Sequence, residues 1–387
     1  MISGLLISLM IYGIIEYYSH QRHLQKIPIR IHVNGTRGKS SVTRLIGAGL
    51  RAHGYKVVTK VTGTFPRLIL PDGSEVAIHR KAGANILEQL NIVKYAARQE
   101  ADILLIECMA LNPIYQRITE HQMIKATHGI ITNIRLDHLD VMGPGLQDVA
   151  NALALTIPKR SKLFTSEDRM DQFIHSRSKE LATEFHQFTG MQITDTDMEG
   201  FSYIEHKANV DLALGICADL GLDRALALSA MKETIPDEGV LRKYSITREN
   251  KEIHFYNALA ANDPESSLML WNNISHREGS QKDFIVLINA RNDRKERSEQ
   301  LVEASSRIEF DKLLLTGENV NLVKTMALKQ NIAETKIHLI GQDPPENQLA
   351  KIIPLIQSET VIVAFGNMGA GGAELSKYFE QNQVKAS

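Results

Sequence analysis

A glycine-rich segment between a predicted strand and a predicted helix is the first place where this sequence could do chemistry. The segment reads NGTRGKSS, and its residues are Asn34, Gly35, Thr36, Arg37, Gly38, Lys39, Ser40 and Ser41. Backbone N–H groups of such a turn at the start of a helix converge on an anion. Lys39 would neutralise phosphate charge and Ser40 would ligate Mg²⁺, as in a P-loop, although Val33 stands where the ordinary P-loop has its first glycine. We therefore predict that the segment binds nucleotide phosphates; the alternative is a plain turn with an exposed Lys39.

Two more side chains follow apolar runs that should form strands beside this loop. Glu107 ends the run ILLIE, and His138 lies in the short loop of TNIRLDHLD after another apolar run. The carboxyl ends of neighbouring parallel strands meet at one edge of a sheet, where α/β folds bind ligands. Ser40, Glu107 and His138 are therefore predicted to bind one or two divalent cations that bridge the phosphates. The alternatives are a structural role for Glu107 and a surface hydrogen bond for His138.

The elements that must position these residues alternate between short apolar strands and amphipathic helices. Between residues 27 and 155, strands are predicted in PIRIHV, YKVVTKVTG, ADILLIECM and THGIITNI. Helices are predicted in SSVTRLIGAGLRAHG and NILEQLNIVKYAARQE, and a further pair around Gly221. After residue 250 the alternation restarts with DFIVLINA, FDKLLLTG, IHLIG and TVIVAFG, whereas residues 165–203 show no clear period. This pattern is typical of α/β domains with parallel sheets covered on both faces.

The same pattern predicts the domain organisation. We expect a P-loop-type central ATPase domain over residues 27–245 and a smaller Rossmann-like C-terminal domain over residues 250–387. The chain has 387 residues, a length too great for one ordinary core. Of these residues, 43% are hydrophobic and 23% are charged. The formal net charge of −1 gives no sign of nucleic acid as a partner. Cys108 and Cys217 are far apart, which argues against a disulfide framework or a zinc site.

The first residues are almost purely apolar. MISGLLISLMIYGIIEYY contains one charged residue, Glu16, and is followed by Arg22 and His23. A bilayer span needs about 20 apolar residues, a length reached here only if Tyr17 and Tyr18 lie at the interface. We predict a hydrophobic N-terminal helix that anchors residues 1–20 in the cell membrane and leaves the rest in the cytoplasm; the alternative is a buried helix.

Three of these motifs together resemble the ATP-binding domain of the Mur ligase superfamily. The motifs are NGTRGKSS, IECMA and TNIRLDHLD, in this order. The resemblance implies an ATP-dependent amide ligase with Mg²⁺ as cofactor, in which a substrate carboxylate takes the γ-phosphate and an amine then displaces it. Lys39, Glu107 and His138 would be catalytic. Asn209, in HKANVDLALGICADLG, would lie near the adenine, and Arg242, in EGVLRKY, would belong to the element before the last domain.

One subgroup, the ligase subunits of poly-γ-glutamate synthases, is more similar. ECMALNP, DHLDVMGP, NALAANDPESS and RNDRKERS carry this resemblance together with the apolar N-terminus. It implies glutamate and the growing poly-γ-glutamate chain as substrates and membrane subunits of a synthase and export complex as partners. Asn262 and Asp263 would then belong to the nucleotide site. How many copies of the chain assemble stays open, a homo-oligomer included.

The sequence departs from the family pattern at two places. Leu153 occupies the position of a lysine that many family members carry as a carbamate, so a second cation would lose a ligand. Asn262 and Asp263 replace the His-Asn pair of folylpolyglutamate synthase, which counts against a folate enzyme.

A dense charge run follows DFIVLINA. Arg291 and Arg294 in this run would stabilise the transferring phosphate if they faced ATP, whereas the alternative is a solvated helix face. Three other functions stay open: a folylpolyglutamate synthase-like ligase, a P-loop kinase or ATPase, and an inactive nucleotide-binding scaffold.

Overall fold

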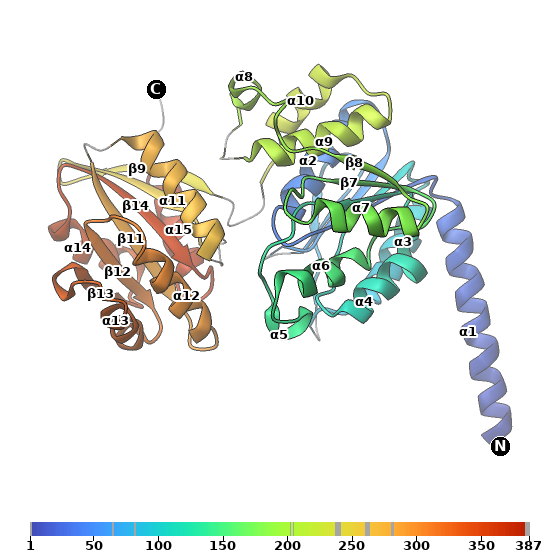
Figure 1. Ribbon diagram of the computed structural model, residues 1–387, viewed down its shortest axis with the longest axis horizontal. Helices are drawn as coiled ribbons and strands as arrows, with labels where there is room; N and C mark the ends of the chain where they lie inside the picture. The colour runs from blue at the N-terminus through green and yellow to red at the C-terminus, as the bar shows by residue number, and fades with distance from the viewer. Residues whose placement is uncertain are drawn as a thin grey trace. The chain divides into compact units, whose positions relative to one another are not determined.

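The computed structural model describes residues 2–63, 66–80, 83–201, 203, 205–236, 241–259, 264–279 and 282–383. The chain divides into two compact units, Met1–Asp237 and Glu238–Ser387, each with its own sheet (Figure 1).

The first unit is built on a mixed sheet whose strands run in the order β4-β3-β2-β5-β1-β6-β7-β8. Their bounds are β1 Ile29–Asn34, β2 Val57–Val61, β3 Arg67–Ile69, β4 Glu75–Ala77, β5 Ile103–Glu107, β6 His128–Ile131, β7 Lys162–Thr165 and β8 Glu184–Gln187. Only the β2–β3 and β3–β4 pairs are antiparallel in the described sheet. Every residue of β5 is buried, as expected for a mostly apolar strand in a sheet covered on both faces.

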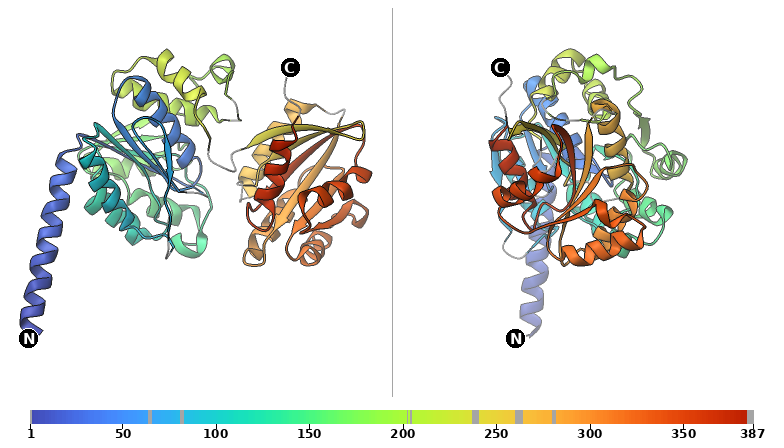
Figure 2. Two further views of the ribbon diagram at one scale, coloured as in Figure 1. Left: turned by 180° about the vertical axis from the view of Figure 1, so that it is seen from behind. Right: turned by 90° about the vertical axis from the view of Figure 1, so that its left-hand side faces the viewer.

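Helices cover both faces of this sheet (Figures 1 and 2). On one face lie α2 Lys39–Ala52, α9 Lys207–Asp219 and α10 Arg224–Lys232, which share a hydrophobic core with β1 and β5. On the other face lie α3 Glu88–Arg98, the π-helical turn η1 Thr119–Ile124, α6 Leu146–Ala154 and α7 Asp171–Glu180. The short helices are α4 Pro113–Ile118, α5 Leu139–Met142 and α8 Asp195–Met198.

The second unit contains a sheet in the order β13-β12-β11-β14-β10-β9. Its strands are β9 Arg242–Arg248, β10 Lys251–Asn257, β11 Asp283–Ala290, β12 Lys312–Gly317, β13 Ile337–Gly341 and β14 Glu359–Gly366. Helices α14 Pro345–Ile352 and α15 Gly372–Gln381 pack on one face, and α11 Pro264–Glu278 and α12 Lys295–Ser305 pack against β14 on the other. Helix α13 Val320–Lys329 contacts α12, and the 3-10 turns are η2 Glu334–Lys336 and η3 Ile353–Leu355. Strand β9 is antiparallel to β10, so this sheet is mixed as well.

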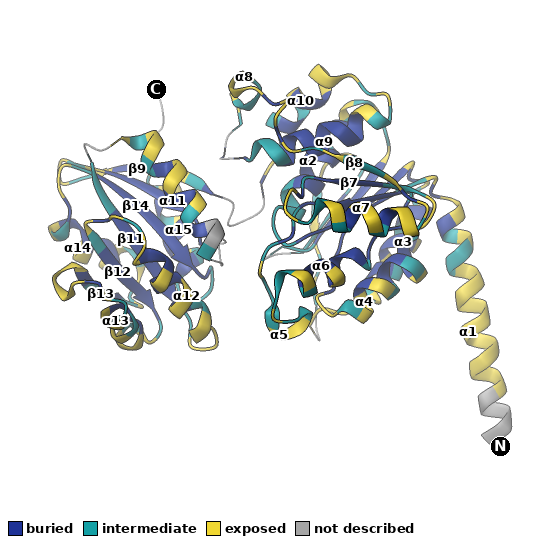
Figure 3. Ribbon diagram, viewed as in Figure 1, coloured by how far each residue is buried: buried dark blue, intermediate teal, exposed yellow. Residues whose placement is uncertain are grey.

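The predicted membrane anchor is wrong. The first residues do form a helix, α1 (Ile2–Gln25), and its large apolar side chains between Ile7 and Tyr18 are exposed (Figure 3). Within the described part of the chain, however, no helix combines the length and the hydropathy that a membrane crossing requires. The physical reason lies in the carboxyl-terminal half of α1, where Glu16, His20 and Arg22 end the apolar run before about 20 residues have accumulated.

Candidate functional site

Three strand ends meet at the carboxyl edge of the first sheet. Strand β1, which leads into the glycine-rich segment, lies between β5 and β6 and is parallel to both. Glu107 is the last residue of β5, and the loop that carries His138 follows β6. The order of these strands therefore brings the predicted residues to one place in the fold.

The backbone of the glycine-rich segment needs its glycines. Gly35 has a φ of +131°, and a Cβ there would lie 2.1 Å from the Thr132 hydroxyl oxygen. Gly38 has a φ of +79° and directly precedes α2. The segment is held against the loop after β6, because the N–H of Thr36 donates to the Asn133 carbonyl (2.9 Å). The turn is thus fixed by conformations that glycine adopts without strain.

Lys39 folds back onto the segment from the first turn of α2. Its Nζ donates to the carbonyl oxygens of Gly35 at 2.6 Å and of Thr36 at 3.2 Å. Burial lowers the pKa of Lys39, and the negative charge of Glu107 opposes that shift. An ammonium group at a helix start beside converging N–H groups makes this a positively charged pocket.

Ser40 and Glu107 form the centre of a hard-oxygen donor set. The Ser40 hydroxyl donates to Glu107 Oε2 at 2.9 Å, and the backbone N–H of Thr62 donates to the same oxygen at 2.7 Å. Glu107 is buried and Ser40 half-buried. A carboxylate and a hydroxyl are ligands that Mg²⁺ accepts, so the chemistry of these side chains fits a divalent cation.

His138 lines the same pocket as Lys39. Lys39 and His138 line one cavity of about 30 Å³ together with Asn34, Gly35 and Thr36. Burial lowers the pKa of His138, and Asp137, whose Oδ2 is 3.7 Å from the imidazole Nε2, opposes the shift. The imidazole is therefore neutral at pH 7 and can offer a nitrogen lone pair.

The remaining predicted residues of the first unit also lie near the loop. Arg37 pairs with Asp137 at 3.4 Å, and Ser41 follows Ser40 in the first turn of α2. Asn209 packs against the loop, since a Cβ on Gly38 would lie 2.9 Å from its Oδ1. Leu153 is buried in the core cluster around Ile131 and Val149, so this position supplies no polar ligand.

Three of the predicted residues of the second unit lie in its described part, and two do not. Arg291 follows β11 and pairs with Asp293 (2.8 Å), and Arg294 directly precedes α12. Arg242 pairs with Glu380 (2.9 Å). Arg291 also lies against Gly369, in the glycine-rich loop after β14. Asn262 and Asp263 lie outside the described residues.

Sequence reasoning missed a buried lysine next to the site. Lys60 of β2 is fully buried, and its Nζ lies 2.7 Å from Glu88 and 2.9 Å from Gln89 Oε1. Burial lowers its pKa, and the hydrogen bond to Glu88 opposes the shift. The signal was a lysine in the otherwise apolar strand VVTKV, because a buried charge needs a partner.

A second missed feature joins β1 to η1. His32 Nδ1 is 2.8 Å from Glu120 Oε2, and both side chains are buried. Burial opposes protonation of His32, but the neighbouring Cys108 and Glu120 side chains outweigh it and raise its pKa to about 9.

Comparison with known proteins covers almost the whole chain. The family described as Mur ligase middle domain matches residues 33–211, and the poly-gamma-glutamate synthase CapB C-terminal domain matches residues 243–382. PGA synthase CapB of Bacillus subtilis (strain 168) is 32% identical over 380 residues, which cover 97% of this chain and 96% of that protein. Capsule biosynthesis protein CapB of Bacillus anthracis is 34% identical over 379 residues, covering 97% and 82%.

A solved structure shares the fold. A bifunctional folylpolyglutamate synthase/dihydrofolate synthase with Mn, AMPPNP and L-glutamate bound superposes with a TM-score of 0.68 over 93% of this chain and 92% of its own. The two sequences are 14% identical, so this likeness concerns the α/β fold with its mixed sheets.

Proposed function

The chain belongs to the CapB family of poly-γ-glutamate synthases, and we propose that it is an ATP-dependent amide ligase that makes γ-glutamyl bonds through an acyl phosphate. The observation that carries the proposal is the set of Lys39, Ser40 and Glu107, gathered where β1 and β5 end, with His138 lining the same pocket as Lys39. Phosphorylating a glutamate carboxylate brings a carboxylate and a triphosphate together. A site for this reaction must therefore supply positive charge.

Lys39 is proposed to supply part of that charge. Its ammonium group now donates to the carbonyls of Gly35 and Thr36. To bind the phosphate oxygens of a triphosphate, Lys39 would have to leave these carbonyls. The N–H groups at the start of α2 then complete the anion site.

Ser40, Glu107 and His138 are proposed to hold a divalent cation, which we infer to be Mg²⁺. When bound, it would neutralise phosphate oxygens while charge develops during transfer. The folylpolyglutamate synthase relative binds AMPPNP and Mn, which supports a nucleotide and a divalent metal here. Glu107 Oε2 already accepts two hydrogen bonds, which fix the orientation of this carboxylate.

Roles are also proposed for residues of the second unit. Arg291 and Arg294 would stabilise the transferring phosphate. Asn209, Arg242, Asn262 and Asp263 would contact the nucleotide. These roles come from the family resemblance and belong to the same proposal.

Glutamate and the growing polymer are the proposed substrates. We also propose that membrane subunits of a synthase and export complex are partners and that copies of the chain assemble with them. Copurification of a tagged chain with such subunits is the expected result. Polymer formation by the isolated chain at the rate seen in cells would contradict the need for partners.

Hydroxylamine trapping tests the reaction. With ATP, Mg²⁺, glutamate and hydroxylamine, the wild-type chain should form a hydroxamate, because hydroxylamine attacks an acyl phosphate. Lys39→Ala should abolish the product, whereas Lys56→Ala, a change at an exposed lysine of the same unit, should not. Release of ADP without hydroxamate would favour a kinase or ATPase, and a requirement for added folate would favour the folate ligase.

A further inference from the structure

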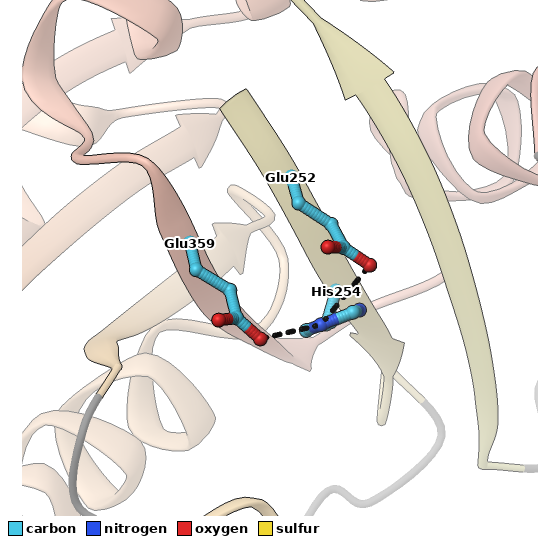
Figure 4. Close-up of side chains that lie close together, drawn as sticks. All are labelled: Glu252, His254 and Glu359. Atoms are coloured by element: carbon cyan, nitrogen blue, oxygen red, sulfur yellow. Dashed lines mark hydrogen bonds and ion pairs between the residues drawn. The ribbon is translucent and has the colours of Figure 1, made fainter. Parts of the chain in front are cut away.

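A histidine and two glutamates meet in the second unit at the amino-terminal ends of β10 and β14. Glu252 and Glu359 are direct neighbours in the register of these two parallel strands. His254 follows Glu252 by two residues, so it lies on the same face of β10. One ligand atom from each residue lies within 4.8 Å of the other two, and Figure 4 shows both carboxylates turned toward the imidazole.

The distances within this cluster suit a shared cation better than a shared proton. His254 Nε2 lies 3.4 Å from Glu359 Oε1 and 3.6 Å from Glu252 Oε1. Hydrogen bonds from a charged imidazole to a carboxylate are about 2.7–2.9 Å long. Two ligand atoms that each lie about 2.1 Å from a tetrahedral zinc ion are, by contrast, roughly 3.4 Å apart.

The imidazole is held in the orientation that a metal ligand needs. His254 is 5% exposed, and its Nδ1 lies 2.8 Å from the hydroxyl of Ser245, its direct partner on β9. Donation of the Nδ1 proton to Ser245 leaves the lone pair of Nε2 facing the two carboxylates. Metal-binding histidines are usually fixed by such a hydrogen bond from the second ring nitrogen.

The charge balance around the cluster favours the binding of a cation. Glu359 contacts Lys282 (2.6 Å), which also contacts Glu278 (2.7 Å), and Glu278 contacts Lys243 (2.6 Å). With Glu252, this network contains three carboxylates and two ammonium groups, so the carboxylates outnumber the ammonium groups by one. Like-charged neighbours on adjacent strands destabilise a sheet unless a positive charge lies between them.

We propose that Glu252, His254 and Glu359 bind one transition-metal cation of the Zn²⁺ class, which ties the starts of β10 and β14 together. One nitrogen and two carboxylate oxygens form a three-ligand set to which water adds the remaining position. The exposure of Glu252 and Glu359, 52% and 43% for the side chains, gives the ion a path from solvent. The site belongs to the second sheet.

Lys282 is the competitor of the metal. Its Nζ contacts the same Oε1 atom of Glu359 that faces His254. A bound cation must therefore share Glu359 with this ammonium group or use its second oxygen. Removal of the ammonium charge should tighten metal binding, because repulsion between the two cations disappears.

Titration of the full-length chain with Zn²⁺ and, separately, with Co²⁺ tests the proposal. Glu252→Gln should weaken Zn²⁺ binding in calorimetry by about tenfold or more and should remove a visible Co²⁺ band of tetrahedral intensity. Glu252 is exposed at a strand start, so this change should leave the fold intact. Glu346→Gln, the same substitution at an exposed residue of α14, is the matched control and should bind like the wild type.

Lys282→Gln separates a metal site from a purely structural ion-pair network. A metal site predicts tighter Zn²⁺ binding in this variant, whereas a structural network predicts no gain. Equal Zn²⁺ affinity in the wild type and Glu252→Gln would overturn the proposal, as would unchanged or weaker affinity in Lys282→Gln with an unchanged melting temperature.

Discussion

At the scale of single residues, Glu107 makes the most direct prediction. Glu107→Gln keeps the size of the side chain but removes the negative charge next to Ser40 and Thr62. We expect the glutamate-dependent release of ADP to fall by about 10²-fold or more, and half-maximal activity to need a higher Mg²⁺ concentration. Both follow from the loss of a charged cation ligand, and a titration of initial rates against Mg²⁺ measures them.

Glu100→Gln is the matched control for this change. Glu100 is exposed and lies before β5, at the opposite end of the strand from Glu107. Its substitution should leave both rate and Mg²⁺ dependence unchanged. A Glu107→Gln variant that loses activity but keeps the wild-type Mg²⁺ dependence would contradict cation binding at this carboxylate.

The residues themselves differ in how well the sequence predicted them. The pocket shared by Lys39 and His138 was predicted from short motifs at strand ends, because such motifs depend only on local order along the chain. Lys60 was missed because its partners Glu88 and Gln89 come from a helix that is separated in sequence. The trio around His254 was missed for the same reason, since Glu359 lies more than 100 residues away.

At the scale of elements, the turn between β1 and α2 can be tested by comparing two glycines that both have positive φ. Gly35→Ala would place a methyl group 2.1 Å from the Thr132 hydroxyl, whereas Gly54, just past α2, has nothing within 4 Å of its Cβ position. Both have positive φ, so alanine strains the backbone at each position. Only Gly35→Ala should also push the anion-binding turn away from the loop after β6.

We therefore expect Gly35→Ala to bind ADP at least about tenfold more weakly in calorimetry, a loss of about 1.4 kcal/mol. Gly54→Ala should bind ADP like the wild type while melting at a lower temperature. Equal ADP affinity in the two variants would show that the close approach of Gly35 to Thr132 does not shape the site.

The buried pair of His32 and Glu120, which joins β1 to η1, predicts that the stability of the first unit depends on pH. Because the neighbouring Cys108 and Glu120 side chains outweigh the effect of burial and raise the pKa of His32 to about 9, protonation favours the folded state. Its ordinary value is about 6.5, so the stabilisation is complete below pH 6.5 and is lost as the pH rises through about 9. The linkage amounts to roughly 3 kcal/mol.

Urea unfolding of the first unit at pH 6.5, 8 and 9.5 measures this loss. Glu120→Gln should be less stable at pH 6.5 and should lose less stability toward pH 9.5, because the negative partner of His32 is absent. Parallel pH dependences in the wild type and Glu120→Gln would contradict the assignment to this pair.

Element prediction succeeded where the apolar runs were long. DFIVLINA and IHLIG coincide with β11 and β13, since a continuous apolar run bounded by turn residues has few other structures. Strands β7 and β8 were not recognised, because they have four residues each and β8 contains EFHQ at the sheet edge. The apolar run of α1 correctly predicted a helix. It wrongly predicted a membrane span, because part of the length of this helix is its polar carboxyl-terminal end and not apolar residues.

At the scale of the whole molecule, each unit has its own core and should unfold as its own body. Although the family relatives match both units, we therefore expect the two units to unfold in separate transitions. The chain contains a single tryptophan, and Trp271 lies in the second unit, buried in a T-shaped contact with Phe284 at 5.8 Å between ring centroids. Tryptophan fluorescence thus reports the unfolding of the second unit alone.

Because the two units should unfold separately, we can predict which melting transition a bound nucleotide shifts most. ADP with Mg²⁺ at about 100 times its Kd stabilises the binding unit by about 2.7 kcal/mol. For a unit of this size, that should raise its melting temperature in calorimetry by roughly 5–10 °C. The transition followed by Trp271 fluorescence should shift by a smaller amount, because ADP lacks the γ-phosphate that Arg291 and Arg294 are proposed to contact and offers this unit only the other proposed nucleotide contacts. Gly35→Ala should remove the calorimetric shift, and an equal shift of the fluorescence transition would contradict the weaker response expected of the second unit.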